Sequence, residues 1–328
     1  MPYRRTTALS RRSERLPSRV TLTTAPATAG GRLRSSPRSR APGEPRSIGY
    51  LYILPAVAFY AVFVFAPFIH TIVLSFFKGN GITTMEFIGV SNYADIITDP
   101  VLRSAFVHAL QLIVFYCFIS IAIGLLLASI LHRSRIRGIA FYRTALFLPY
   151  VIAPTAIAVI WRWILAPRGP LNTFLDAIGL QALSRPWLGD FTWALPSVGM
   201  VGTWVMFGLV LALLLAGVQK IPSELYEAVR LDGGGAWTEF RVVTLPGLRY
   251  EIIVAMVLTI TAALRNFDIV YVMTSGGPGN ATVVPSYLVY QQAFKVAQIG
   301  AAAAMGTALI IAIIAVNVLI TRLGRGTT

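Results

Sequence analysis

The chain alternates between long apolar runs and shorter polar segments. The apolar runs are about 20 residues long, the length at which an α-helix crosses about 30 Å of hydrocarbon. They are continuous rather than alternating, which favours helices over a β-barrel, the other structure that satisfies its own backbone in lipid. They also lack the polar face that a surface helix of a soluble protein needs. The pattern predicts an all-α membrane protein with six transmembrane helices, near residues 49–77, 105–131, 143–166, 195–218, 250–272 and 299–321.

Composition agrees with a membrane protein, since 56% of the 328 residues are hydrophobic and only 12% are charged. Soluble domains carry about 25% charged residues. Much of the net charge of +15 comes from eleven arginines in residues 1–48, which contain two glutamates and almost no apolar periodicity. We expect this segment to be a disordered basic tail, either on anionic lipid or in solvent. The net charge therefore gives no reason to expect nucleic acid as a partner. After this tail, residues 49–325 form the predicted transmembrane domain.

The distribution of Lys and Arg predicts the orientation of the spans. With the amino terminus inside, the cytoplasmic segments hold 21 of the 28 basic residues. The outer segments, 78–104, 167–194 and 273–298, hold only 5. An even number of spans places both ends of the chain on one side. We therefore expect a multi-pass protein of the cell (inner) membrane with both termini in the cytoplasm.

One polar segment, residues 219–249, carries signals for an ordered structure. Pro222 suits the first turn of a helix, and three glycines at 233–235 suit its end. Trp237 and Phe240 share one side of a second short helix, which Leu245-Pro246 is expected to end. This helix–turn–helix could lie on the membrane as an amphipathic element, or it could serve as a docking site for a partner.

The residue order in this segment resembles the Glu-Ala-Ala loop of permease subunits of bacterial ABC importers. The loop pattern is matched by seven residues, Glu227, Ala228, Asp232, Gly233, Phe240, Leu245 and Pro246. It departs at Val229, where alanine is usual, and at Gly234 and Gly235. Residues 87–93, 160–164 and 267–278 are similar to the carbohydrate-uptake branch of the same family, so the resemblance covers nearly all of 49–325.

The resemblance implies a type I ABC importer permease fold that works by alternating access. The segment 219–249 would then be the cytoplasmic element that couples the permease to an ATPase, with Arg230 and Trp237 beside the seven matching residues. The implied partners are a second homologous permease, two copies of the ATPase subunit, an extracytoplasmic solute-binding protein and membrane lipid. ATP and Mg²⁺ would bind to the ATPase subunits.

The sequence contains no Gly-Lys dipeptide, and therefore no Walker A loop to hold ATP phosphates. It also has no His and Cys spacing typical of a metal site. We therefore expect no catalytic residue, metal or cofactor in this chain, which would not itself be an enzyme.

Charged residues within predicted spans are candidates for a transport path, because charge is costly in lipid. They are Arg162, Arg265 and Asp268. A structural alternative is that Arg265 and Asp268 neutralise each other on one helix face and that Arg162 reaches the headgroups. In the functional alternative, these charges line a cavity together with four further residues, Trp161, Asn266, Phe267 and Tyr271. Asn317, a lone amide in the last span, is expected to link helices.

The sequence thus predicts the permease subunit of an ATP-driven importer for a sugar or related polar solute. Two other classes stay open, a gradient-driven secondary transporter and a membrane scaffold without a transport path. The motifs are shared by uptake systems for sugars, polyols and glycerophosphodiesters, so they do not identify the solute.

Overall fold

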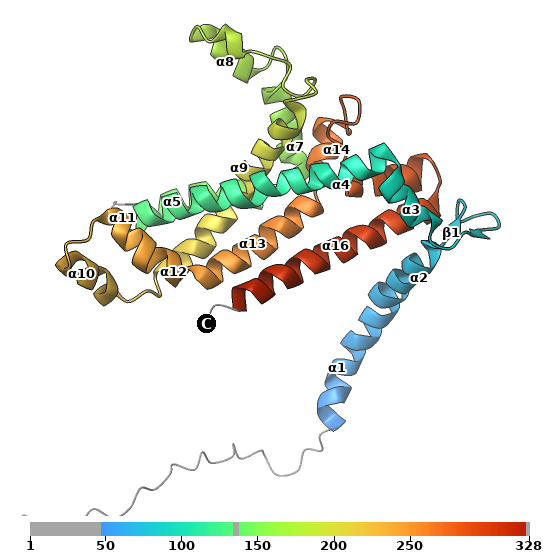
Figure 1. Cartoon of the computed structure of the whole chain (residues 1–328), viewed down its shortest axis with the longest axis horizontal. Helices are drawn as coiled ribbons and strands as arrows, with labels where there is room; N and C mark the ends of the chain where they lie inside the picture. The colour runs from blue at the N-terminus through green and yellow to red at the C-terminus, as the bar shows by residue number, and fades with distance from the viewer. Residues whose placement is uncertain (1–46, 134–137, 326–328) are drawn as a thin grey trace, which may run out of the picture. The chain divides into compact units, whose positions relative to one another are not determined.

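The computed structural model describes residues 47–133 and 138–325, almost entirely as helices (Figure 1). The chain divides into two units, residues 1–55 and 56–328. The predicted basic tail lies outside the described residues except for its last two positions. The elements are α1 (Ser47–Tyr60), η1 (Ala61–Phe65), α2 (Ala66–Leu74), β1 (Phe77–Lys78), β2 (Glu86–Phe87), α3 (Ser91–Thr98), α4 (Pro100–Ile113), η2 (Val114–Ile119), α5 (Ser120–Arg133), α6 (Ile139–Val151), α7 (Pro154–Ile164), α8 (Pro170–Ala177), η3 (Gln181–Leu183), α9 (Ala194–Val218), α10 (Ser223–Leu231), α11 (Ala236–Glu239), η4 (Phe240–Thr244), α12 (Leu245–Gly247), α13 (Arg249–Leu264), α14 (Asp268–Met273), α15 (Pro285–Tyr290), η5 (Gln291–Lys295) and α16 (Ile299–Arg325).

Four continuous helical stretches in the described chain are long and apolar enough to cross a membrane. They are Tyr50–Leu74, Pro100–Leu131, Ala194–Val218 and Ile299–Gly324. Each coincides with a predicted span, although the second begins earlier than residue 105. The reason is a strong helix start, because the Asp99 side chain accepts hydrogen bonds from the backbone of Val101 and Leu102. Pro100 then occupies the first turn, where its missing N–H costs nothing.

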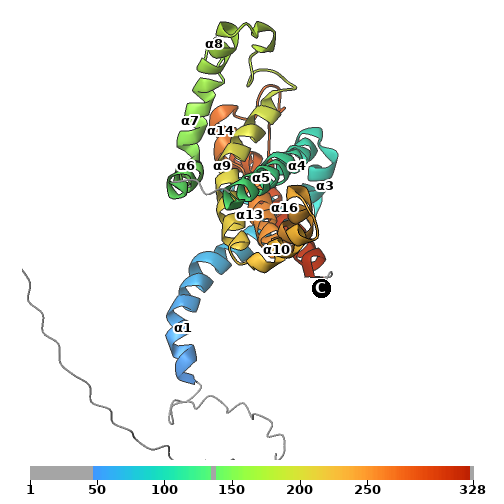
Figure 2. The same ribbon diagram turned by 90° about the vertical axis from the view of Figure 1, so that its left-hand side faces the viewer.

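The predicted span 143–166 is not a single straight helix. Helices α6 and α7 are bent by 95° at the short break between them. Figure 2 shows α6 nearly end-on and α7 rising from it. The break follows from Pro154, because a residue before proline is pushed out of the helical region. Ala153 is extended, with φ −56° and ψ 129°, and Pro154 starts the new helix.

The predicted span 250–272 is also interrupted. Helix α13 ends at Leu264, and α14 begins only at Asp268. The carbonyl of Asn266, in the break, accepts a hydrogen bond of 2.7 Å from the Ser286 hydroxyl instead of continuing the helical ladder. At its other end α13 is bent by 68° from the helical stretch Ala236–Gly247. Counting each bent pair as one span gives up to six spans in the described chain. The second of these pairs, however, joins α13 to the stretch Ala236–Gly247, which was predicted within the polar segment 219–249, and not to α14.

The core of the second unit follows α9, which has apolar residues on all sides. It packs against α5, α6 and α13, and α13 in turn packs against α16 (Figure 1). Two clusters of buried side chains lie along this bundle. One joins α4, α7, α9, α14 and α15, and the other joins α5, α9, α13 and α16. Asn317 on α16 donates a 3.0 Å hydrogen bond to Thr261 on α13, as expected for an amide that links helices.

Candidate functional sites

The segment between α9 and α13 folds as a helix–turn–helix. Helix α10 ends in two backbone hydrogen bonds, from Gly233 to the carbonyl of Arg230 and from Gly234 to that of Val229. Together they form a Schellman motif, which requires a left-handed residue just after the helix. Gly233 supplies it with φ +77°. The glycines therefore set a tight reversal, after which α11 begins at Ala236.

The second helix of this segment is longer than expected. It was predicted to end at Leu245-Pro246, but the helical turns continue through η4 and α12 to Gly247. Proline in a regular helix clashes with the carbonyl four residues earlier. Here the wider π-helical turn η4 precedes it, and Leu245 donates to the carbonyl of Phe240. We attribute the tolerance of Pro246 to this wider turn.

The two helices expose large apolar side chains as well as charged ones. Leu231 and Trp237 are exposed by 88% and 71%, and the Trp237 ring stacks on Phe240 with their centroids 5.5 Å apart. Glu227 and Asp232 are also exposed on this element. Exposed apolar patches with a charged rim are typical of protein contacts. Of the predicted coupling residues, Arg230 differs, since its Nε donates a 2.9 Å hydrogen bond to Glu239 on the second helix.

A second candidate site is a pocket of about 330 Å³ at the break between α13 and α14. Four predicted residues line it, namely Arg265, Asn266, Phe267 and Asp268. Its other polar lining comes from Tyr116 and Thr261. Ligand pockets in proteins occupy about 300–1,000 Å³, so this pocket is large enough for a small polar solute.

Two buried polar atoms at this pocket make no hydrogen bond of normal geometry within the described residues, although their side chains lie close enough to interact with each other. They are the hydroxyl of Tyr116, which is 2% exposed, and Nδ2 of Asn266, which is 7% exposed. Buried polar groups almost always have partners, and each exception calls for an explanation. Here the exceptions meet at one cavity, so a polar ligand or water in that cavity would satisfy both.

The position of Tyr116 depends on a close approach between η2 and α9. A Cβ atom at Gly202 would lie 1.9 Å from Cε2 of the Tyr116 ring. Only glycine leaves room for the ring at this point. Tyr116 also sits in a π-helical turn, a local widening that is frequent at functional sites.

We expect Gly202→Ala to displace the Tyr116 ring and to destabilise the protein by about 1–3 kcal/mol, the usual cost of overpacking. The measurement is the thermal unfolding of the detergent-solubilised protein. Gly306→Ala is the matched control, because a Cβ there meets no atom within 4 Å. An unfolding temperature unchanged in both variants would contradict the close contact.

Three predicted path residues lie elsewhere. Trp161 packs edge-on against Trp204 at 5.6 Å. Arg162 donates a 3.3 Å hydrogen bond to the carbonyl of Val272 at the end of α14. Tyr271 stacks on Phe267 at 5.2 Å, behind the pocket rather than in its lining.

The ion pair considered for Arg265 and Asp268 is absent from the described structure. The two residues were expected three positions apart on one helix, but α13 ends at Leu264 and Asp268 opens α14. The break therefore separates the two side chains, which both line the pocket.

Two residues at these sites were not selected from the sequence. Tyr116 was overlooked as one aromatic residue in an apolar run, although a hydroxyl in such a run is itself a signal. Glu239 lies outside the loop pattern. The available clue to its role was that its charge is opposite to that of Arg230. Within the described residues, no group of three or more His, Cys, Asp or Glu side chains could hold a metal ion.

Comparison with known proteins gives a family match over most of this structure. Residues 120–328 match the family model described as binding-protein-dependent transport system inner membrane component. The probable ABC transporter permease protein YurN of Bacillus subtilis is 39% identical over 84% of this chain and 95% of its own length. The diacetylchitobiose uptake system permease protein NgcF of Streptomyces coelicolor is 32% identical over 87% of this chain and 83% of its own length.

A solved structure has the same fold. It is a bacterial ABC transporter involved in the import of the acidic polysaccharide alginate, with a TM-score of 0.75 and 21% identity. The match covers 86% of this chain and 96% of that one. The solved structure of the same fold and the relatives found by sequence are both described as ABC transporter proteins. The chain therefore belongs to the family of binding-protein-dependent transport system inner membrane components, the permease subunits of ABC transporters.

Proposed function

We propose that this permease subunit imports a sugar or a closely related polar solute by alternating access. Several relatives support this solute class by name. NgcF belongs to a diacetylchitobiose uptake system, and the permease LacF of Rhizobium radiobacter, 31% identical over 75% of this chain, belongs to a lactose transport system. These systems transport different solutes, so they support a solute class for this chain rather than one compound.

The observation that carries the proposal is the pair of neighbouring buried polar groups, on Tyr116 and Asn266, that lack hydrogen bonds of normal geometry at the pocket beside the helix break. Sugar hydroxyls both donate and accept hydrogen bonds, so one solute could satisfy Tyr116 and Asn266 together. Phe267 adds an aromatic face to the same lining. In membrane proteins, interrupted helices are tolerated where the free backbone lines a cavity, which fits a solute path at residues 265–267.

The helix–turn–helix at residues 223–247 is the proposed ATPase contact. We assign docking to the exposed part of the predicted coupling set, which includes Glu227 and Trp237. The proposed assembly also contains a second permease, two ATPase subunits that bind ATP and Mg²⁺, and a solute-binding protein. A relative of the same fold is known in complex with an alginate pentasaccharide-bound periplasmic protein, which supports the last partner. The distribution of Lys and Arg supports a cytoplasmic position for this element and for both termini.

Reconstitution in proteoliposomes tests the proposal. We expect uptake of a labelled sugar only when the second permease, the ATPase, ATP and a binding protein loaded with that sugar are all present. Thermal shifts of the binding protein with a panel of sugars and polyols would select the solute. Uptake driven by an ion gradient without ATP would instead identify a secondary transporter, and no uptake with any loaded binding protein would favour a scaffold.

Asp268→Ala is expected to reduce uptake without dissociating the complex. The carboxylate is exposed at the pocket and makes no ion pair in the described structure, so its removal should barely affect stability. Uptake and subunit co-purification are measured together. Asp176→Ala, an exposed acid on α8 outside the pocket, is the control. Unchanged uptake in Asp268→Ala would exclude the carboxylate from the path.

A further inference from the structure

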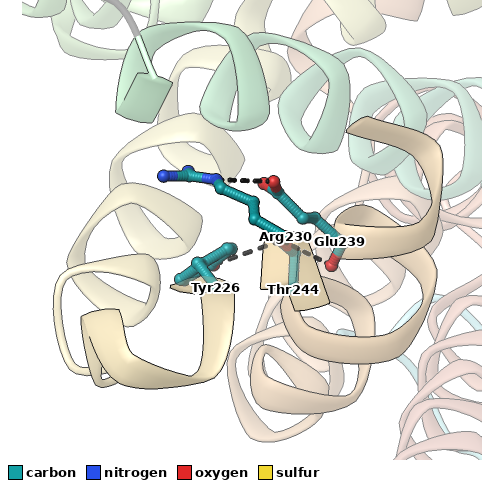
Figure 3. A network of polar contacts seen from close by, with 4 residues as sticks. All are labelled: Tyr226, Arg230, Glu239 and Thr244. Atoms are coloured by element: carbon teal, nitrogen blue, oxygen red, sulfur yellow. Dashed lines mark hydrogen bonds and ion pairs between the residues drawn. The ribbon is translucent and has the colours of Figure 1, made fainter. Parts of the chain in front are cut away.

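Two side-chain contacts cross the glycine turn of the helix–turn–helix, and a third lies within the second helical stretch (Figure 3). Arg230 Nε on α10 donates to Glu239 Oε1 on α11 at 2.9 Å. The Tyr226 hydroxyl lies 3.2 Å from the Thr244 hydroxyl. The Thr244 hydroxyl in turn donates to the backbone carbonyl of Glu239 at 3.4 Å. Figure 3 shows these four residues between the two helices, so the contacts tie the first helix to the second.

Three of these four side chains are buried, and Arg230 is the exposed one. The Glu239 side chain is only 5% exposed, whereas that of Arg230 is 60% exposed. Tyr226 and Thr244 are exposed by 5% and 4%. Exposed ion pairs contribute little, but removing one partner of a buried charge is strongly unfavourable. The burial of Glu239 therefore makes the loss of its guanidinium donor costly.

The turn between the helices consists of Gly233, Gly234 and Gly235, and glycine is the residue with the greatest conformational freedom. Gly234 packs closely on Val229 and Thr238, whereas a Cβ at Gly233 or at Gly235 would meet no atom within 4 Å. The hydrogen bonds of this turn involve only α10 carbonyls, so they fix the end of α10. The side-chain contacts between the two helices add a direct link between α10 and the second helix.

The second helix is connected to the pocket through α13. Helices α11, η4 and α12 form one helical stretch that is bent by 68° from α13. At its far end α13 stops at Leu264, immediately before the pocket residues Arg265 and Asn266. A displacement of α10 can reach the pocket along this stretch only if α10 and α11 move together.

We propose that Arg230 and Glu239, assisted by Tyr226 and Thr244, are positioning residues that make α10 and α11–α12 move as one rigid body. We call these four residues the brace. Through the brace, the movement of a partner docked on α10 reaches α13 and the pocket. The proposal rests on the proposed role of residues 223–247 as the ATPase contact. It assigns Arg230 to an internal contact instead of the docking surface, and it gives Glu239 a role that the loop pattern does not contain.

A double-mutant cycle tests the brace in the complete complex in proteoliposomes. The variants are Arg230→Met, Glu239→Gln and the two combined, with Tyr226→Phe as an independent probe of the second contact. We measure ATPase co-purification and the solute transported per ATP hydrolysed. Arg230→Met should keep the ATPase bound but lower transport per ATP by about 5- to 150-fold, the usual range of coupling between sites.

The double variant distinguishes a brace from a simple loss of charge. Glu239→Gln neutralises the buried carboxylate that loses the Arg230 hydrogen bond in Arg230→Met, so the combined variant should transport better than Arg230→Met alone. Lys220 and Glu251 form a matched control pair at 3.1 Å, with Lys220 74% exposed. The effects of Lys220→Met and Glu251→Gln on transport per ATP should be additive, and both variants should transport nearly as much per ATP as the unsubstituted protein.

Each result tests either the proposed function or the proposed brace. If the ATPase does not co-purify with the unsubstituted protein, the proposed function fails. If the ATPase binds but Arg230→Met, Glu239→Gln and Tyr226→Phe all transport normally per ATP, the brace is overturned while the proposed function stands. Should Arg230→Met fail to insert, Glu239→Gln and Tyr226→Phe still decide, because each keeps the Arg230 side chain and the size of the residue it replaces.

Discussion

Gly233→Asp and Glu227→Lys are each expected to abolish uptake and co-purification of the ATPase while leaving membrane insertion intact. A Cβ at Gly233 meets open space, so an aspartate there would project its charge outward onto the proposed docking surface. The left-handed backbone with φ +77° costs a non-glycine residue about 1–2 kcal/mol, and less for Asp. Glu227 is exposed on α10, so its reversal changes the surface charge rather than the core.

Two controls separate docking from folding. Gly235→Asp introduces the same side chain two residues later, where φ is −83° and a Cβ also meets open space. Aspartate is a favoured residue at this helix start, so uptake should be retained. Glu224→Lys makes the same charge change one turn before Glu227, outside the loop pattern. Normal uptake in Gly233→Asp and Glu227→Lys would refute the docking assignment.

The sequence predicted most of the helices because their cause is local. A run such as Ala194–Val218 is apolar on all sides and long enough to cross a membrane, and its one proline, Pro196, lies in the first turn, where a helix tolerates it. Pro222 and the three glycines at 233–235 likewise located the helix–turn–helix and its turn. These features depend on neighbours within a few residues, which a sequence displays directly.

What the sequence did not predict depends on backbone direction and on distant contacts. Averaged apolarity is the same for a straight helix and for two helices bent by 95°, so 143–166 was taken as one span despite Pro154. The end of α13 involves Ser286, twenty residues beyond Asn266. Tyr116 reaches the pocket because Gly202 on another helix leaves it room. None of these partners can be identified from spacing along the chain.

The largest expected effect at the pocket is that of Asn266→Leu, which keeps the branched shape of the side chain, although it is larger, and removes the amide. Nδ2 of Asn266 makes no hydrogen bond of normal geometry within the described residues, and its side chain lies close to the Tyr116 hydroxyl. A solute hydroxyl bound to that amide would lose its partner. An unsatisfied buried polar group costs about 1–3 kcal/mol, so the apparent affinity for solute in uptake assays should fall by about 5- to 150-fold.

Tyr116→Phe should act in the same direction for the same reason, since it deletes only the unsatisfied hydroxyl. Tyr287→Phe is its control, because Tyr287 is also buried, at 5% exposure, but does not line the pocket. A structural role predicts a different outcome from a binding role. If Asn266 and Tyr116 served packing alone, both variants would change the unfolding temperature and leave the concentration dependence of uptake intact. A rise in the half-saturating solute concentration at constant unfolding temperature would therefore place the solute against these two side chains.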